Sequence, residues 1–306
     1  MTWMLKSASE QSHAVRLREL LDSGEPLSVP GVFNPMTAMI ARKVGFDALY
    51  FSGAAFSASL GIPDIGLFTL AELTDAVRWM VRASGLPFIV DADTGFGEAI
   101  NVIRTVKELE EAGAAAIQIE DQVLPKRCGH LDGKTVVSTD AFVEKIAAAA
   151  RARKDMLIIA RTDVRAIEGM EAAIERGRLC KEAGADIIFP EAMQSLDEFR
   201  MYADAVGGDL LANMTEFGKS PYLSVDEFAA LGYNIVIFPV STLRAAAKTT
   251  EDLLTDLKRT GTQVEWLPKM QTRAELYELI QYDAYAEVDS ALALGSNRAY
   301  MERLEG

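Results

Sequence analysis

Eight short apolar runs recur along the chain, and longer amphipathic stretches separate them. The runs span residues 27–32, 48–51, 87–90, 115–119, 156–160, 186–189, 209–212 and 234–238. Each has the length of a strand that is buried on both faces. The stretches 69–84, 98–111, 139–153, 168–183 and 242–259 have the apolar spacing of helices. This alternation predicts an α/β fold with a parallel sheet.

Four of the runs follow a glycine that ends a predicted helix. In VGFDALYFS, AGAAAIQIE, AGADIIFPE and LGYNIVIFP, these glycines are Gly45, Gly113, Gly184 and Gly232. Glycine adopts the left-handed conformation of a helix C-terminus at low cost, so the sequence contains an internal βα repeat. Eight such units, without a glycine-rich nucleotide-binding fingerprint, predict a closed (β/α)8 barrel of the TIM type.

Composition limits the domain organisation and the partners. No Pro/Gly-rich linker interrupts the chain, so we expect one domain over residues 1–306, with a helical C-terminal extension at about 271–304. The net charge of −14 argues against binding to nucleic acids or to a membrane surface. Two cysteines cannot form a disulfide framework, and the first residues do not read as a secretory signal, so we expect a cytoplasmic protein.

Polar side chains follow every predicted strand, which is where a barrel of this type places its chemistry. They are Asn34, Ser52, Asp91, Asp93, Glu120, Asp121, Arg161, Asp163, Glu191, Asn213, Thr215, Glu216, Ser241 and Arg244. Each alone could be an ordinary surface residue. Several, however, lie in apolar segments such as IIARTD and IIFPEA, where a buried charge is costly unless it is paired or used.

Asp91 and Asp93 are the candidate metal ligands. Their spacing in VDADTG directs both carboxylates to one face of the strand. Because the chain has only two histidines, the site must consist mostly of oxygen ligands, which favours Mg²⁺, with Mn²⁺ as the alternative. A pair of ion-paired or helix-capping aspartates is the competing interpretation.

Cys128 lies in PKRCGHLDGK, a polar loop after the fourth predicted strand. We expect the neighbouring Lys126, Arg127 and His130 to favour the thiolate and to assist proton transfer. Cys180 lies in a predicted helix, where its pattern indicates a packing role.

Two arginines and two glutamates complete the set of candidate residues. Arg161 and Arg244 have the side chain that binds a carboxylate through two parallel hydrogen bonds. Glu120 and Glu191 either serve a metal through water or form salt bridges with these arginines. The sequence leaves both interpretations open.

These motifs resemble the isocitrate lyase and phosphoenolpyruvate mutase superfamily over residues 30–285. The similar segments are SGAAFSASLGIPD, VDADTGFG, PKRCGH, ARTD, FPEA, LANMTEFGK and MQTRAELYELI. KRCGH is typical of the lyase branch, and MQTR followed by ELYELI is typical of methylisocitrate lyases. The resemblance implies Mg²⁺-dependent cleavage of 2-methylisocitrate, a tricarboxylate, into pyruvate and succinate. Isocitrate lyase or oxaloacetate hydrolase activity is the alternative, and a non-catalytic metabolite-binding scaffold is a third.

The same resemblance implies a role for each matching residue. The substrate contacts would be Ser52, Gly53, Ala54, Cys128, Gly129, Arg161, Glu191, Asn213, Met214, Thr215, Arg244 and Arg273. Cys128 would donate a proton, Arg161 and Glu191 would be catalytic, and Tyr50, Glu120 or Glu191 would be the base. Asp91 and Asp93 would bind the metal, which Asp64 and Glu120 would reach through water.

The resemblance also implies an assembly. The C-terminal helices would be exchanged between subunits, which gives a homotetramer built from dimers. The plainer interpretation is that these helices close their own barrel.

Overall fold

The eight predicted strands form a closed parallel barrel in the computed structural model, which describes residues 11–131 and 133–293. The strands are β1 (Leu27–Val32), β2 (Leu49–Phe51), β3 (Phe88–Asp91), β4 (Ala116–Glu120), β5 (Leu157–Thr162), β6 (Ile187–Pro190), β7 (Asp209–Asn213) and β8 (Ile235–Phe238). Each strand pairs with its sequence neighbours, and β8 returns to β1 with Val29 opposite Ile237. The predicted barrel is confirmed, and the predicted strand limits differ from these by at most two residues.

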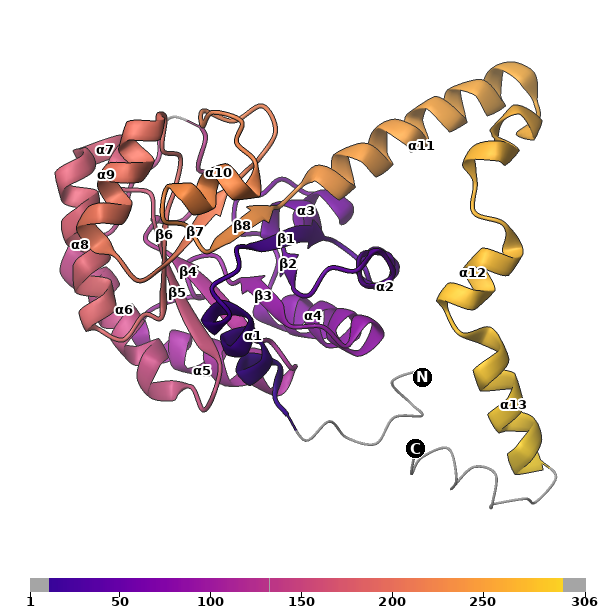
Figure 1. Ribbon diagram of the computed structural model, residues 1–306, viewed down its shortest axis with the longest axis horizontal. Helices are drawn as coiled ribbons and strands as arrows, with labels where there is room; N and C mark the ends of the chain where they lie inside the picture. Colours follow the sequence, from indigo (N-terminus) through magenta and orange to yellow (C-terminus); the bar gives the residue numbers. More distant parts are fainter. Residues whose placement is uncertain (1–10, 132, 294–306) are drawn as a thin grey trace.

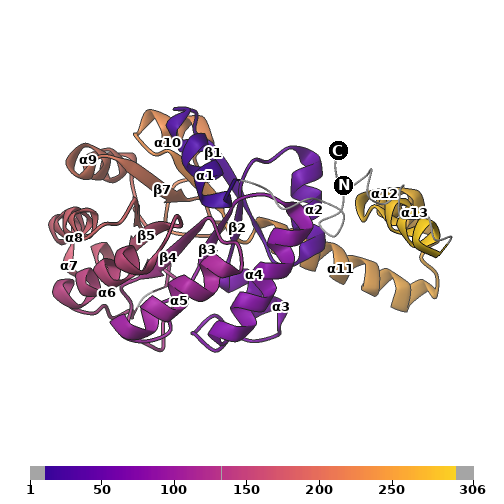
Figure 2. The same cartoon turned by 90° about the horizontal axis from the view of Figure 1, so that it is seen from below.

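The helices surround the barrel in chain order (Figures 1 and 2). They are α1 (His13–Asp22), α2 (Pro35–Val44), α3 (Gly53–Ser59), α4 (Leu70–Ser84), α5 (Ala99–Glu111), α6 (Thr139–Ala152), α7 (Arg165–Glu168), α8 (Met170–Glu182), α9 (Leu196–Val206) and α10 (Val225–Ala230). Gly45, Gly113, Gly184 and Gly232 have φ angles of 104°, 98°, 107° and 93°, so all four adopt the predicted left-handed conformation. The helix predicted over 168–183 begins later, because Gly169 separates α7 from α8.

Alternating strand residues divide the apolar interior into two cores. Val29, Tyr50 and Ile89 belong to the core inside the barrel, which Leu17 and Leu21 of α1 close at one end. The intervening strand residues pack outward against the helices. The end opposite α1 is left for polar side chains, and the carboxyl ends of the strands lie there.

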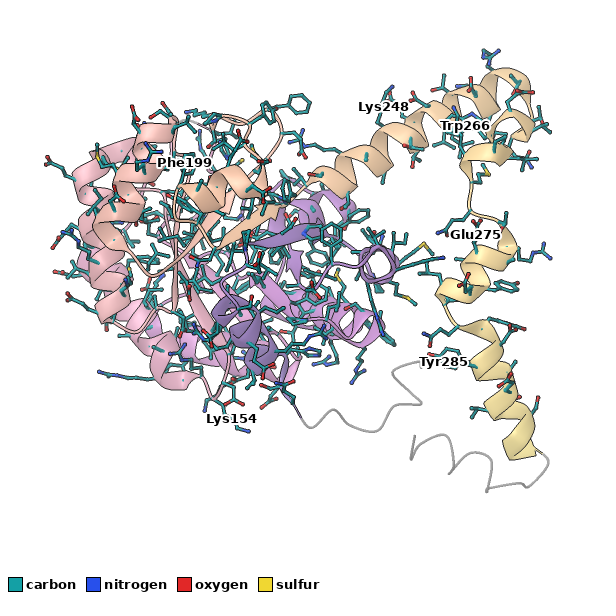
Figure 3. The ribbon with its side chains drawn as sticks, in the orientation of Figure 1. Lys154, Phe199, Lys248, Trp266, Glu275 and Tyr285 are labelled. Carbon is teal, nitrogen blue, oxygen red and sulfur yellow. The ribbon has the colours of Figure 1, made fainter. Side chains whose placement is uncertain are left out.

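The chain after β8 leaves the barrel as an arm, residues 241–293. It consists of α11 (Ser241–Thr260), the 3₁₀ helix η1 (Val264–Lys269), α12 (Arg273–Leu279) and α13 (Tyr282–Ala293). Figure 1 shows α11 pointing away from the barrel, and Figure 3 shows Lys248 and Glu275 in solvent while Phe199 lies in the core. The predicted C-terminal extension is helical to residue 293, and its residues 294–304 lie outside the described residues.

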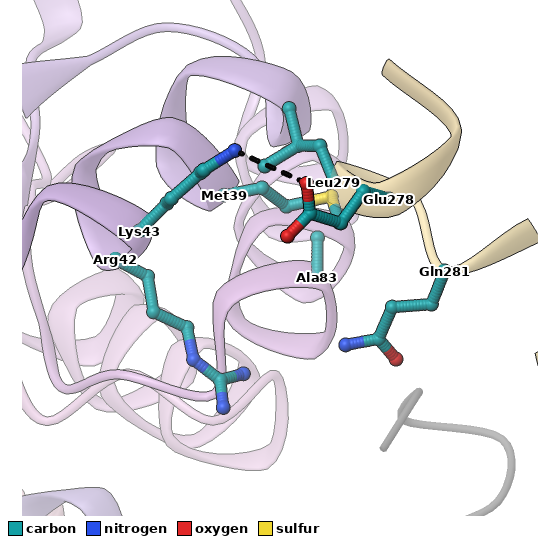
Figure 4. Close-up of a pocket in the computed structure, with 7 residues that line it drawn as sticks. All are labelled: Met39, Arg42, Lys43, Ala83, Glu278, Leu279 and Gln281. Atoms are coloured by element: carbon teal, nitrogen blue, oxygen red, sulfur yellow. Dashed lines mark ion pairs between the residues drawn. The ribbon is translucent and has the colours of Figure 1, made fainter. Parts of the chain in front are cut away.

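The arm returns to the barrel at α2. Around Leu279 it forms a shallow pocket with Met39, Arg42, Lys43 and Ala83, and Lys43 lies 3.8 Å from Glu278 (Figure 4). This ion pair is exposed and therefore contributes little to stability. Over the range that the structure describes, no helix is both long and apolar enough to cross a membrane.

Candidate active site

Arg161, at the end of β5, is the centre of the polar cluster at the strand ends. Its guanidinium lies 3.0 Å from Asp163, 3.3 Å from Glu120 and 3.4 Å from Glu191, and it stacks over the ring of Phe189. Burial alone would lower the pKa of Arg161, but the surrounding carboxylates, Asp163 first, raise it well above its ordinary value. The structure thus holds a permanent cation against the carboxyl ends of β4, β5 and β6.

Asp91 and Asp93 meet beside the first turn of α3. A Cβ atom on Gly53 would lie 3.0 Å from Asp91 Oδ2 and 3.4 Å from Asp93 Oδ1, so the glycine backbone lies close to both carboxylates and a side chain there would crowd Asp91. Asp91 accepts hydrogen bonds from the backbone N–H groups of Gly53 and Asp93 and from the Gln118 amide, each 3.2 Å long. Asp93 has a φ of 47°, a strained conformation that turns its side chain toward the cluster.

Lys126 supplies the cation next to these aspartates. Its Nζ lies 2.8 Å from Asp93 and 2.6 Å from Asp64, and its side chain is almost fully buried. Burial raises the pKa of Asp93 to about 7, although Lys126 partly offsets that effect. One lysine is therefore too little charge to keep the whole acidic cluster ionised.

The oxygen atoms of this cluster fit a hard divalent cation. Apart from ion pairs, both oxygens of Asp93 and both of Glu120 lack a hydrogen-bond donor among the described residues, although all four atoms are buried. Burial also raises the pKa of Glu120 well above its ordinary value. Within the same residues, no group of three or more His, Cys, Asp and Glu side chains is arranged to hold a metal. The buried oxygens of Asp93 and Glu120 instead fit an ion that takes one or two carboxylate ligands and keeps several water or substrate oxygens.

Cys128 lies in a loop that reaches back over Arg161. A Cβ atom on Gly129 would lie 2.4 Å from Glu191 Cγ and 2.7 Å from Arg161 Nη2, so the loop backbone rests directly on these two side chains. His130 accepts a hydrogen bond from the Lys219 N–H at Nδ1, which leaves the proton on Nε2, 3.2 Å from Glu191. Cys128 is thus brought to the same end of the barrel as Asp91.

The electrostatic environment of Cys128 differs from the prediction. Cys128 as a whole is exposed, but partial burial of its thiol raises the pKa of that thiol. The charges of Glu191 and Asp64 raise the pKa further, while Arg161 lowers it. Lys126 does not stabilise a thiolate, because it is paired with Asp64 and Asp93. The expected thiolate is therefore wrong, and the cysteine keeps its proton at neutral pH.

Glu191 is the opposite case. Burial would raise its pKa, but Arg161, His130 and Lys134 together lower it to about 2. Its oxygens also accept hydrogen bonds from the Ala192 N–H and from the Asn213 amide. Glu191 is therefore an ionised anchor for Arg161 and the loop.

Tyr50 does not fit the role of base. Its hydroxyl donates a 2.8 Å hydrogen bond to Gln118, inside the barrel. Burial, together with the charge of Asp91, raises the pKa of the phenol well above 10. Tyr50 instead supports Gln118, which in turn binds Asp91.

The remaining predicted residues divide into two groups. Ser52 caps α3 by accepting the Ala55 N–H, and it precedes Gly53 and Ala54 at the edge of the cluster, with Asn213 and Thr215 at the end of β7. The Met214 side chain packs into the outer core, so only its backbone can face a substrate. Arg244, at the start of α11, is half exposed, lies 3.5 Å from Glu216 and stacks over Phe217. Arg273 is exposed on α12 of the arm and not at the strand ends.

Two supporting residues, Gln118 and Lys134, were absent from the predicted site. Gln118 binds Asp91, and Asp163 binds both Arg161 and Lys134. Gln118 could have been found as a polar residue inside the apolar strand AIQIE. Lys134 gave no such signal, because a lysine in a polar loop is usually solvated.

The lowered pKa of Glu191 leads to a prediction about acid stability. An ionised group with a depressed folded-state pKa stabilises the fold above its ordinary value of 4.5, and the contribution is lost as the pH falls toward 2. We expect Glu191→Gln to lower the free energy of unfolding by on the order of 3 kcal/mol at neutral pH. The deficit should shrink as the pH falls. Urea unfolding of both proteins at about pH 7, 5 and 3 measures it, and a deficit that stays constant would contradict the assigned ionisation.

Known proteins share this fold and these motifs. The family model described as phosphoenolpyruvate phosphomutase matches residues 17–258. A 2-methylisocitrate lyase of Aeropyrum pernix is 56% identical over 277 residues, which cover 90% of each chain.

Two solved structures are similar along nearly the whole chain. The crystal structure of 2,3-dimethylmalate lyase, itself described as a member of the PEP mutase/isocitrate lyase superfamily, has a TM-score of 0.87 and 37% identity, covering 93% of this chain and 96% of that one. Oxaloacetate acetylhydrolase with 3,3-difluorooxalacetate has a TM-score of 0.87 and 36% identity, covering 92% and 97%. The chain belongs to the phosphoenolpyruvate mutase/isocitrate lyase superfamily, as a member of its carbon–carbon lyases.

Proposed function

We propose that this chain cleaves 2-methylisocitrate into pyruvate and succinate with the help of Mg²⁺. The observation that carries the proposal is the convergence at one barrel end of Asp91 and Asp93, Arg161 and the Cys128 loop. A tricarboxylate needs local cations in a protein with a net charge of −14. Arg161 is such a cation, and Arg244 at the start of α11 is a second.

The superfamily is metal-dependent, and we propose Mg²⁺ as the ion, with Mn²⁺ as a substitute. Asp91 and Asp93 would hold it, while Glu120 and Asp64 would reach it through water. The oxygens of Asp93 and Glu120, which have no hydrogen-bond donor among the described residues apart from their ion pairs, support this assignment. The chemistry that a bound Mg²⁺ supplies here is polarisation of the substrate hydroxyl and stabilisation of the charge that develops on its oxygen.

Glu120 fits the base better than the other two candidates. The Tyr50 hydroxyl donates its hydrogen bond to Gln118. Glu191 accepts hydrogen bonds from its neighbours and has a low pKa. Both oxygens of Glu120 are buried and, apart from the ion pair with Arg161, lack a donor in the part of the chain that the structure describes. Glu120 would accept the proton from the substrate hydroxyl as the adjacent carbon–carbon bond breaks.

Cys128 would complete the reaction as general acid. Bond cleavage leaves a carbanion beside a carboxylate on the succinate fragment, and the Cys128 thiol would transfer its proton to that carbon. The raised pKa of the thiol supports this role, because a general acid must carry its proton at the working pH. We further propose that the reaction takes place in the cytoplasm, where free thiols stay reduced.

Substrate turnover tests the proposed function. We expect pyruvate and succinate from 2-methylisocitrate, with kcat/KM at least about tenfold above that for isocitrate, since a fitted methyl pocket discriminates by about 1–3 kcal/mol. A chelator should abolish turnover, and added Mg²⁺ should restore it. Oxalate release from oxaloacetate, with no reaction of 2-methylisocitrate, would assign the alternative activity. Failure to turn over any of these acids with Mg²⁺ would favour a non-catalytic scaffold.

Replacement of Cys128 tests the acid. We expect Cys128→Ala to lower kcat by about 10²–10⁴-fold with little change in KM, because the proton donor is lost while the substrate contacts remain. Cys180→Ala is the matched control, since Cys180 is buried in α8, and it should keep its kcat. Near-normal turnover by a folded Cys128→Ala protein would remove the cysteine from this role.

We also propose that the arm is exchanged between subunits in a homotetramer built from dimers. Apolar side chains on α11 support this proposal, because Leu254 and Leu257 are 56% and 38% exposed in a single chain. Light scattering at several concentrations should give a mass of about four chains, and Leu254→Glu with Leu257→Glu should lower it. A monomer at every concentration would contradict the proposal.

A further inference from the structure

The loop that carries Cys128 is closed at its base by backbone pairing. The Val123 N–H donates to the Thr135 carbonyl at 2.9 Å, and the Val137 N–H donates to the Asp121 carbonyl at 2.8 Å. An isolated antiparallel bridge joins Gln122 to Val136 between them. The chain between these pairs, described at residues 123–131 and 133–135, therefore forms a compact loop on a narrow neck. Such a loop can pivot as a unit unless its tip is fixed to the barrel.

Lys134 lies at this neck, yet its side chain is turned inward. Only 2% of that side chain is exposed, and its Nζ lies 2.7 Å from Asp163 Oδ1. The same Nζ donates to the carbonyl of Gly129, the residue after Cys128. Burying an ammonium group is costly unless it is paired and hydrogen-bonded. Lys134 therefore joins the loop tip to the end of β5 by a charged contact.

Asp163 is a rigid anchor for this contact. Its backbone N–H donates to Asp121 at 2.9 Å, and Asp121 also accepts from the Thr162 hydroxyl and from the guanidinium of Arg176 on α8. Arg176 is 1% exposed. The chain of contacts from α8 to the loop tip thus passes through Asp121, Asp163 and Lys134, all of which are buried.

We propose that Lys134 is a positioning residue that fixes the Gly129 carbonyl to Asp163 and thereby holds Cys128 over Arg161 and Glu191. The inference rests on the proposed function in one respect, namely that Cys128 is the proton donor. Lys134 also shares Asp163 with Arg161, which leaves the remaining edge of the guanidinium directed at Glu120 and Glu191. Lys126 and His130 hold other parts of the loop, through Asp64, Asp93 and Glu191. Loss of Lys134 would therefore loosen the tip around Gly129 without removing any group that reacts.

Alkylation of Cys128 by iodoacetamide measures its position without turnover. In the folded protein, burial, Glu191 and Asp64 raise the pKa of the thiol, while Arg161 and the His130 N–H lower it. A loosened tip would expose the Cys128 thiol to water, which should move its pKa down toward the ordinary value. We expect Lys134→Met to shift the pH profile of Cys128 alkylation to lower pH and to raise its rate about tenfold near pH 7.

Two controls separate positioning from a general loss of structure. Cys180 is buried, so its peptide should stay unmodified in every folded variant when modification is followed by mass spectrometry. Lys181→Met removes a partly buried lysine that likewise donates to backbone carbonyls, those of Val206 and Gly207, and it should keep the wild-type profile.

Hydrogen exchange supplies a second measurement. Lys134→Met should speed exchange in the peptide that covers residues 123–137 and leave α8 unchanged, and kcat for 2-methylisocitrate should fall with little change in KM. Wild-type alkylation together with wild-type exchange in Lys134→Met would overturn the proposal. If the enzyme cleaves no hydroxy-acid, the proposed function fails while alkylation and exchange still decide the role of Lys134.

Discussion

The buried charge at one end of the barrel is the constraint on which the rest of the site depends. The buried carboxylates at this end include Asp91, Asp93, Glu120, Asp121, Asp163 and Glu191, and the buried cations that pair with them are Lys126, Lys134, Arg161 and Arg176. An excess of buried negative charge is unstable, which is why burial raises the pKa values of Asp93 and Glu120. The folded chain thus holds an acidic cluster that a divalent cation would stabilise, and the metal-dependent chemistry follows from that imbalance.

The distribution of the cations decides which carboxylates stay ionised. Arg161 and His130 hold Glu191 as an anion, whereas Glu120 shares Arg161 with two other carboxylates and has no hydrogen-bond donor besides that ion pair among the described residues. Two glutamates at the ends of β4 and β6, on either side of β5, therefore acquire opposite properties from their surroundings. This separation is what an acid–base reaction needs, because an anchor must not exchange protons and a base must do so.

The barrel follows from local sequence, and much of the site follows from the barrel. Apolar runs and four helix-ending glycines give the strand order, and parallel strands then bring Asp91, Arg161 and Glu191 together at one end. Pairings that depend on the path of a loop could not be predicted in this way. Lys126 reaches Asp64 and Lys134 reaches Asp163 across long stretches of sequence, so the charge expected near Cys128 is used elsewhere. For this reason, the predicted direction of the Cys128 pKa shift was wrong: the pKa is raised and not lowered.

The packing of the arm is a second feature that the sequence pattern alone does not predict. The pattern over 242–259 predicts an amphipathic helix, and α11 forms over nearly those residues, yet none of its described residues is buried. Pairs such as Lys248–Asp252 and Arg259–Asp256 contribute only a few tenths of a kcal/mol each, and most of the stability of a helix in a protein comes from packing of its apolar face. Within the described residues of one chain, Leu254 and Leu257 on this helix therefore stay exposed. Arg273 follows on the same arm. Any surface that α11 packs against would therefore also decide to which barrel Arg273 is brought.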